Sequence, residues 1–270
     1  MTHLTAELVY WITEREAIRY RRAAGEPRPW SEDPIFRTVR FCNTHRERDT
    51  VTQWIRQWWN TADDPAWRFV LARLLNLPES LAEVQQFRQP DNIRTILKMR
   101  RTQGHKVFTS AYTVSTCGQA IDKVDYIINV INAVREEERL NPIRYGSCHS
   151  TWQHLQLIDG LGSFLAAQVV ADMKNTRRHP LAGAPDWWTF SAPGPGSLRG
   201  LSWYFKGRPD GVTPTNYAAA LAECRAQVDH HLHHIDRLSD QDFQNCLCEF
   251  SKYMKVKTYG GHVRNKFNGG

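Results

Sequence analysis

Two glycines one residue apart, Gly160 and Gly162, separate an amphipathic segment from an apolar, alanine-rich one, and they constrain the fold more than any other feature. Glycine adopts positive φ angles without strain, so the pair predicts a tight hairpin between two helices over about residues 151–175, with φ > 0 at both glycines. Glycines also leave the backbone amides at the start of the second helix bare, and such amides bind phosphate. We therefore expect Gly160, Gly162 and Ser163 to contact a phosphate group. An ordinary helical hairpin without a ligand is the alternative that this feature alone leaves open.

The rest of the chain also has mostly helical periodicity, with apolar residues recurring three and four positions apart. Helices are expected over residues 4–25, 34–59 with a break near Asn43, 63–77, 85–104, 120–140 and 217–255, with a crossing rich in proline and glycine over 180–211. Alternating β periodicity is confined to one short piece, residues 105–114. The sequence thus predicts a mainly α fold without repeats. We expect a single domain over residues 1–270 whose N- and C-terminal helices pack together.

Charge and cysteine usage narrow the class of protein. The 270 residues include 35 Lys and Arg against 28 Asp and Glu, a net charge of +7, and the isoelectric point is about 9.2. Such a balance suits a polyanionic partner, although many basic proteins bind none. The six cysteines form no CxxC pair, and the sequence shows no signal peptide and no apolar run of the ~20 residues needed to cross a bilayer. We expect a cytoplasmic protein with reduced thiols and no membrane partner.

The hairpin segment resembles the helix-hairpin-helix of the DNA glycosylase superfamily, and this resemblance implies that Gly160, Gly162 and Ser163 contact a phosphate of DNA. In that superfamily a glycine hairpin is followed roughly twenty residues later by an aspartate, and here Asp186 lies 24 residues beyond Gly162, in APDWWTF. Glycosylases that form a Schiff base have a lysine two residues after the second glycine, where this sequence has Phe164. A lyase that uses a lysine imine is therefore not expected.

Five segments extend the resemblance beyond glycosylases. They occur in the order PWSEDPIFRTVRFCNTHRERDTVTQWI, HKVFTSAYTV, GLGSFLAAQVVADM, APGPGSLRGL and CLCEFSKYMK. Together they resemble a phage-associated family first named α-glutamyl/putrescinyl thymine pyrophosphorylases and later regarded as amino acid:DNA transferases. The resemblance covers roughly residues 10–266. It implies a helical, glycosylase-like protein with two lobes flanking a DNA-binding cleft, working in thymidine hypermodification in the cytoplasm of a phage-infected bacterial cell.

The resemblance also implies a reaction. After a DNA kinase has placed phosphate or pyrophosphate on 5-hydroxymethyluracil in double-stranded DNA, the amine of a free amino acid displaces the activated oxygen from the exocyclic methylene. This requires a base flipped out of the duplex, cations for the leaving phosphate, a carboxylate base for the amine and an Arg or Lys for the carboxylate of the amino acid. No metal or other cofactor is needed. A small aromatic pocket would favour glycine, and an acidic pocket ornithine or a polyamine.

Several polar residues could supply these groups. Asn43, Arg46 and Asp49 are spaced by three, so in a helix they would share one face. The first two could bind an oxyanion or a carboxylate, and Asp49 could orient the arginine or accept a proton. A surface ladder of ion pairs, worth only tenths of a kcal/mol, is the alternative; the family resemblance favours the functional interpretation.

Two further segments carry candidate substrate-binding groups. Lys106, Thr109 and Tyr112 could bind a phosphate or a base edge, or could simply belong to a half-buried strand or turn. In APGPGSLRGL, Ser197 could cap a helix whose first turn contains Arg199. A cation opposes the dipole at that end of a helix, which suits binding of pyrophosphate or DNA, although a solvated arginine on a crossover would have the same sequence.

Besides Asp49, three further carboxylates could act as the base. Glu249 and Lys252 lie three apart, so a substrate site and a structural ion pair are both consistent with the spacing; partial burial would raise the pKa of Glu249. Asp172 lies towards the end of the second hairpin helix, where it opposes the dipole. Asp172 and Asp186 form the leading acidic pair, and Asp186 matches the glycosylase aspartate.

Two remaining observations, on metal binding and on ATP binding, bear on the choice between functions. The DHHLHHID cluster could place two histidines on one metal ion, but solvent-facing histidines on an amphipathic helix are favoured. No Walker A motif is present, so ATP is expected to be used by a partner kinase. We expect a transferase acting on activated 5-hydroxymethyluracil. The alternatives are a monofunctional glycosylase for a modified base and a non-catalytic DNA-binding protein.

Overall fold

The computed structural model describes residues 3–59, 65–109 and 115–260, and within these ranges the chain forms helices and no β-strand. The predicted mainly α fold is therefore confirmed. The β-like piece is wrong over residues 105–109, which have no regular structure, and its other half lies outside the described residues. No described helix is long and apolar enough to cross a membrane. The chain divides into two compact units, residues 1–46 with 191–270 and residues 47–190.

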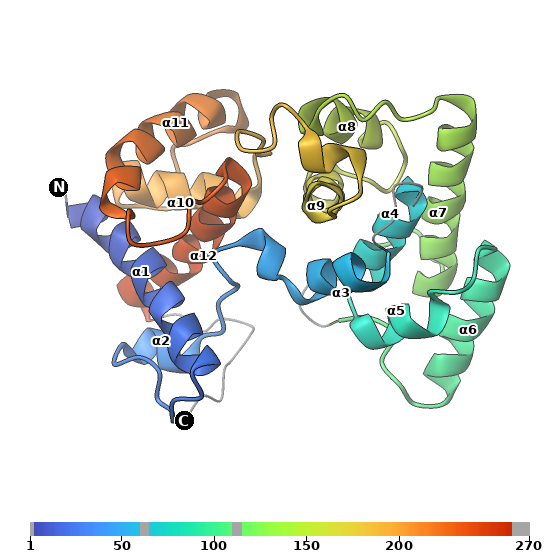
Figure 1. The fold of residues 1–270 in the computed structure, drawn as a ribbon, viewed down its shortest axis with the longest axis horizontal. Coiled ribbons are helices and arrows are strands. Elements are labelled where there is room, and N and C mark those ends of the chain that lie inside the picture. Colours follow the sequence, from blue (N-terminus) through green and yellow to red (C-terminus); the bar gives the residue numbers. More distant parts are fainter. Residues whose placement is uncertain (1–2, 60–64, 110–114, 261–270) are drawn as a thin grey trace. The chain divides into compact units, whose positions relative to one another are not determined.

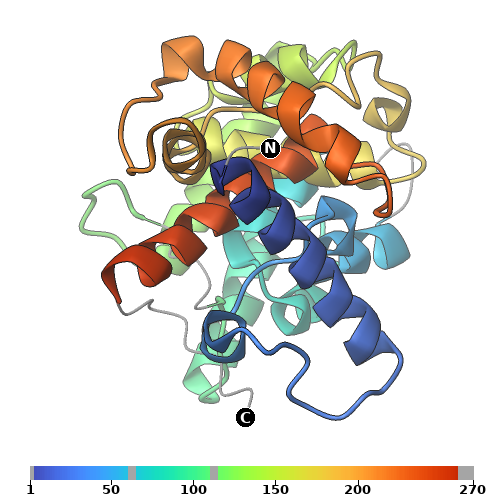
Figure 2. The ribbon, with the colours of Figure 1, turned by 90° about the vertical axis from the view of Figure 1, so that its left-hand side faces the viewer.

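The first unit combines the beginning and the end of the chain (Figure 1). Its helices are α1 (His3–Ala23), α2 (Pro34–Thr38), α10 (Pro195–Lys206), α11 (Tyr217–Val228) and α12 (Asp240–Tyr259). Figure 2 shows α1 crossing α12, and the two helices share a core in which Leu8 and Trp11 pack with Phe250. Helices α10 and α12 are in close contact at Gly200, where a Cβ would collide with the backbone carbonyl of Leu247.

The second unit is built around a helix that is buried on every side. Its helices are α3 (Thr50–Trp58), α4 (Ala66–Leu75), α5 (Pro78–Val84), α6 (Pro90–Thr102), α7 (Lys123–Leu140), α8 (Cys148–Leu155) and α9 (Ser163–Asn175). All ten residues of α4 are buried, and α3, α5, α7 and α9 pack around it. Since a helix that is buried on every face lies inside a core, α4 fixes the positions of α7 and α9, which support the hairpin.

Candidate functional site

The hairpin between α8 and α9 is a tight turn that requires one glycine. Gly160 has φ +88°, and a Cβ there would lie 2.7 Å from Val130 Cγ2 on α7. Gly162 has φ −68° and is the N-cap of α9, so the prediction of a positive φ at this second glycine is wrong. Gly160 is therefore required by the positive φ of the turn and by the close contact with α7. Gly162 is under neither constraint.

The start of α9 is accessible. Gly162 is exposed, provides no side-chain cap, and has open space where a Cβ would project. Ser163 begins the helix, and its carbonyl oxygen accepts a hydrogen bond from Trp152 Nε1 at 3.0 Å, which ties α8 to α9. A 13-residue helix without a side-chain cap presents the positive end of its dipole at this point. This geometry suits a phosphate, and contact with DNA stays a prediction.

The side chain of Asp186 contacts the N-terminus of α8, the first hairpin helix. Its carboxylate accepts hydrogen bonds from the amides of Cys148 at 2.7 Å and His149 at 2.9 Å. Lys174 and Trp187 hold the adjoining loop: Lys174 Nζ donates to the Trp187 carbonyl at 2.7 Å, and Trp187 Nε1 donates to the Lys174 carbonyl at 2.8 Å. A carboxylate at a helix N-terminus is stabilising. In this position Asp186 supports α8, and its catalytic role stays a prediction.

Asp172, the other member of the leading acidic pair, is inside the second unit. Arg73 of α4 donates to both of its carboxylate oxygens, and Thr52 Oγ1 donates to Oδ1 at 2.7 Å. Asp49 accepts a hydrogen bond from the same arginine at 2.9 Å and caps α3. The side chains of Arg73 and Asp172 are 1% and 0% exposed, against 38% for Asp49. Asp172 therefore balances a buried arginine, whereas Asp49 can still be reached from solvent.

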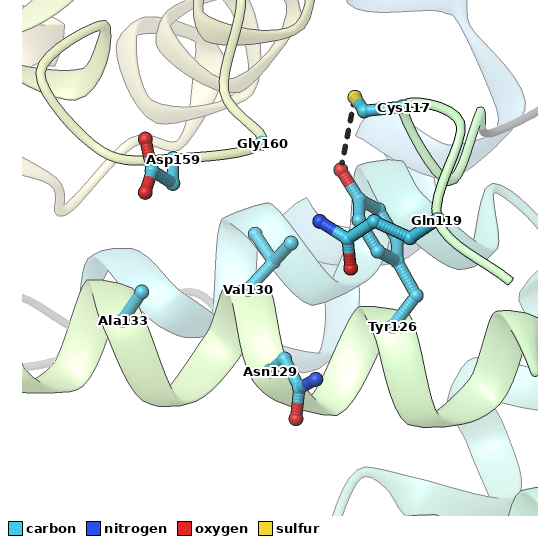
Figure 3. Close-up of a pocket in the computed structure, with 8 residues that line it drawn as sticks. All are labelled: Cys117, Gln119, Tyr126, Asn129, Val130, Ala133, Asp159 and Gly160. Carbon is cyan, nitrogen blue, oxygen red and sulfur yellow. Dashed lines mark hydrogen bonds between the residues drawn. The ribbon is translucent and has the colours of Figure 1, made fainter. Parts of the chain in front are cut away.

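A cavity of about 590 Å³ adjoins the hairpin, between its turn and α7 (Figure 3). Eight residues line it: Cys117, Gln119, Tyr126, Asn129, Val130, Ala133, Asp159 and Gly160. Cys117 Sγ and Tyr126 Oη form a hydrogen bond of 3.3 Å. Burial, with smaller effects of Cys117 and Asp159, raises the pKa of Tyr126 to about 12. Apart from Gly160, no lining residue was predicted as a site residue.

In the first unit, the segment that carries Asn43 and Arg46 is not a continuous helix, so the predicted shared face with Asp49 is wrong. Residues 39–45 have no helix, and one 3-10 turn follows. Arg46 is buried, and its amide donates to Asp242 Oδ1 on α12 at 2.5 Å. Asn43 and Arg46 belong to the first unit, whereas Asp49 belongs to the second and begins a new helix there.

The same segment joins α1 to α12 through five residues that we call the α1–α12 polar cluster: Arg15, Cys42, Asn43, Glu249 and Lys252. Buried Glu249 accepts a hydrogen bond from the Cys42 amide at 3.0 Å and pairs with Lys252 Nζ at 2.5 Å. Arg15 Nε donates to the Cys42 carbonyl at 2.9 Å, and its Nη2 donates to Asn43 Oδ1 at 2.7 Å. Three predicted site residues, Asn43, Glu249 and Lys252, thus lie together.

The other candidate substrate-binding residues lie elsewhere. Lys106 is exposed, and its carbonyl accepts a hydrogen bond from Arg100 Nε at 2.7 Å. The Thr109 amide donates to the Leu75 carbonyl at 3.2 Å, and Tyr112 lies outside the described residues. Arg199 is exposed on α10, which begins four residues earlier, so the prediction that it occupies the first turn is wrong.

Ser197 takes part in capping α10, as expected, but from a position inside the helix. Gly194 is the N-cap, and Ser197, two residues inside the helix, accepts a hydrogen bond from the Gly194 amide at 3.2 Å. The histidine cluster was expected on an amphipathic helix, but it lies on a 3-10 turn after α11 and the loop that follows. Among the described residues, no three His, Cys, Asp or Glu side chains are placed to hold a metal ion.

Two charged residues of these clusters were missed from the sequence. Arg73 could have been found, because a charged residue in a strongly apolar helical run signals a buried partner, although Arg68 of the same helix carries the same signal. Arg15 lies on a helix rich in charged residues and carries no such signal. Its importance comes from the distant segment that packs against it.

The described residues define an all-helical protein with a glycine hairpin, and comparison with known proteins adds the family. A family model described as "5-hmdU DNA kinase, helical domain" matches residues 2–261, so the chain belongs to this family. The 5-hmdU DNA kinase of Bacillus phage SP10 is 26% identical over 226 residues, which are 72% of this chain and 35% of the relative. The chain thus spans about a third of the length of that relative. No solved structure matches.

Proposed function

We propose that this protein acts on 5-hydroxymethyluracil in DNA. The observation that carries the proposal is the family match over residues 2–261, because the family and the phage relative are both described by this modified nucleoside. The net charge of +7 suits a DNA partner. The accessible start of α9 offers backbone amides to a phosphate of the DNA backbone. Such contacts hold the duplex without reading its sequence, so specificity must come from the modified base.

Within this function, we propose transfer of an amino acid as the reaction. The amine nitrogen attacks the exocyclic methylene carbon of a phosphate- or pyrophosphate-activated base, the carbon–oxygen bond breaks, and phosphate or pyrophosphate leaves. A carboxylate takes the proton that the amine loses. The five ordered motifs support this reaction, and the α1–α12 polar cluster supplies a carboxylate, Glu249, beside two cations, Arg15 and Lys252. Base flipping is required because the methylene is otherwise stacked in the duplex.

The four candidate bases differ in how accessible their carboxylates are to solvent and to an amine. Asp172 is enclosed with Arg73, which leaves no room for an amine unless the ion pair opens. Asp49 is 38% exposed, and Asp186 is half-buried with both oxygens hydrogen-bonded to α8. Glu249 is 3% exposed, but its partner Lys252 is partly open to solvent. We favour Glu249 and Asp49 as bases, and structural roles for Asp172 and Asp186.

A second function is favoured by the family description. The chain could hold DNA for a kinase, since the family is described as the helical domain of such an enzyme. The sequence has no Walker A motif of its own. In that case the hairpin would bind the duplex, and phosphate transfer would require a separate nucleotide-binding domain.

One experiment separates these functions. Purified protein is incubated with 5-hydroxymethyluracil DNA, with or without prior phosphorylation by a DNA kinase, and with a mixture of amino acids. Mass spectrometry of the digested nucleosides would show an amino acid adduct only on phosphorylated DNA, and Glu249→Gln would reduce it at least 100-fold. Salt-sensitive binding without a product would support the DNA-holding function, and abasic sites would indicate a glycosylase. Failure to bind or change either DNA would contradict both proposals.

A further inference from the structure

Arg15 is a cation without an acidic partner of its own. It lies on α1, is half-buried, and donates two hydrogen bonds to neutral acceptors, the Cys42 carbonyl and Asn43 Oδ1. Within the described chain it forms no ion pair, and Nη1 makes no hydrogen bond. Arg15 Nη1 is accessible to solvent. The guanidinium is therefore held in one orientation with part of its donor set still available.

The electrostatic surroundings of Arg15 leave its charge poorly balanced. Burial lowers its pKa, and the effect of burial outweighs the opposite effects of Glu16 and Glu249. Both carboxylates already have a cation, because Glu16 pairs with Arg19 at 2.9 Å and Glu249 pairs with Lys252 at 2.5 Å. A buried cation of this kind is stabilised by an anion that binds beside it.

We infer that Arg15, oriented by Asn43 and Cys42, binds the α-carboxylate of a free amino acid, whose amino group lies towards Glu249. An arginine fork matches the two oxygens of a carboxylate. Cys42 connects the two ends of the site, since its carbonyl binds Arg15 and its amide binds Glu249. This inference rests on the proposed function, for which it names the amine-binding residues.

The choice of an amino acid over a phosphate follows from charge. Two carboxylates, Glu16 and Glu249, are close enough to act on Arg15. Arg19 and Lys252 offset part of the charge of these carboxylates, but a phosphate dianion at Arg15 would bring two negative charges beside them and no positive charge. A zwitterion instead places one negative charge at the arginine and its positive end near a carboxylate. The same arrangement would bring the amine next to Glu249, which could then accept its proton.

Binding without DNA tests this inference. The Nε–H of Arg15 is followed by NMR in ¹⁵N-labelled protein, and its resonance is assigned from its loss in Arg15→Lys. Glycine, glutamate and ornithine are titrated separately, together with acetate, methylamine and inorganic phosphate. We expect at least one amino acid to shift this resonance, acetate to bind more weakly, and methylamine to have no effect. Arg15→Gln should weaken the amino acid affinity at least ten-fold, because a charge-assisted bidentate contact is lost.

Arg22→Gln is the matched control, because it removes the same charge from an exposed position on the same helix. The affinity of this variant for the amino acid should stay within two-fold of that of the unaltered protein. Arg15→Lys keeps the charge without the fork and should give an intermediate affinity, so the comparison survives if the glutamine variant is unstable. No amino acid binding, equal binding to Arg15→Gln, or an Arg15-dependent response to phosphate alone would overturn the inference. The titration contains no DNA and no turnover, so its outcome is independent of the adduct assay.

Discussion

Asp172 shows how one side chain can have the chemistry of a catalytic acid and the surroundings of a structural one. Its carboxylate, Arg73 and Thr52 form a closed set of hydrogen bonds, and Asp49 extends this set to the surface. Breaking a buried ion pair leaves one uncompensated charge, which costs more free energy than the pair contributes. The stability of a variant therefore distinguishes the two roles.

We expect Asp172→Asn to lower the free energy of unfolding by about 3–5 kcal/mol, because Arg73 would stay buried without a counter-charge. Urea denaturation followed by circular dichroism measures this. Asp49→Asn is the control and should cost about 1 kcal/mol or less, since asparagine also caps helices. Full stability of Asp172→Asn with loss of adduct formation would show instead that Asp172 is catalytic.

Gly160 provides a second test of the role of a single residue. An alanine there must adopt φ +88° and place its Cβ 2.7 Å from Val130 Cγ2. We expect Gly160→Ala to destabilise the protein by roughly 2–4 kcal/mol, from backbone strain and overpacking together. Gly162→Ala has open space and φ −68°, so thermal unfolding should reveal a loss below about 1 kcal/mol, from the poorer cap alone. Equal losses for the two variants would contradict this account of the turn.

Among the helix contacts, the one between α10 and α12 depends on the absence of a side chain at Gly200. Gly200 faces the backbone of α12 at Leu247, and a Cβ would collide with a main-chain carbonyl that cannot rotate away. Close approach of two helix backbones buries both helices more completely than larger residues would allow. The helices of the first unit are therefore sensitive to very small additions at this point.

Gly200→Ala should lower the free energy of unfolding by about 2–3 kcal/mol or more, because the helices must separate to admit one methyl group. Chemical denaturation monitored by tryptophan fluorescence checks this. Gly183→Ala, at a glycine with open space and no positive φ, should change stability by no more than about 0.5 kcal/mol. A neutral result for Gly200→Ala would mean that α10 and α12 are not packed this closely.

The sequence predicted the elements better than their contacts. Periodic apolar residues located α1, α4, α6, α7 and the hairpin, because helical burial repeats along the chain. The sequence placed α10 within a crossing rich in proline and glycine and indicated a helix there only through the cap expected at Ser197. It did not show that Pro195 occupies the first turn of α10 or that Gly200 makes a close helix contact. Asn43, Glu249 and Lys252 were predicted as site residues, but Arg15 was not, because only tertiary packing brings α1 beside the Cys42 segment.

Across the whole molecule, buried thiols and phenols make stability depend on alkaline pH. Burial, with a smaller effect of Asp186, raises the pKa of Cys148 from 9.0 to about 12. Burial is also the main cause that raises the pKa of Cys248 to about 11 and of Tyr126 to about 12. Below about pH 8 these groups are protonated in both the folded and the unfolded state. Above it the unfolded chain releases protons that the folded chain retains, so stability falls as pH rises.

We expect the free energy of unfolding to fall by about 1 kcal/mol between pH 9 and 10 for each fully buried thiol such as Cys148. Urea denaturation at a series of pH values measures the slope. Cys148→Ala should make the slope shallower by that amount, because it removes a buried thiol. An unaltered slope in Cys148→Ala would show that this thiol ionises normally in the folded protein.

The division of the first unit between residues 1–46 and 191–270 has a consequence for biosynthesis. A ribosome releases α1 before residues 47–190 and before its partners α10 and α12 exist, a delay on the order of ten seconds at ordinary translation speeds. During this interval the apolar stripe of α1, including Leu8, Trp11 and Ile12, has no native surface to cover it. Helix α1 is thus made well before the helices that bury it, and the nascent chain exposes a natural target for chaperones throughout translation of the second unit.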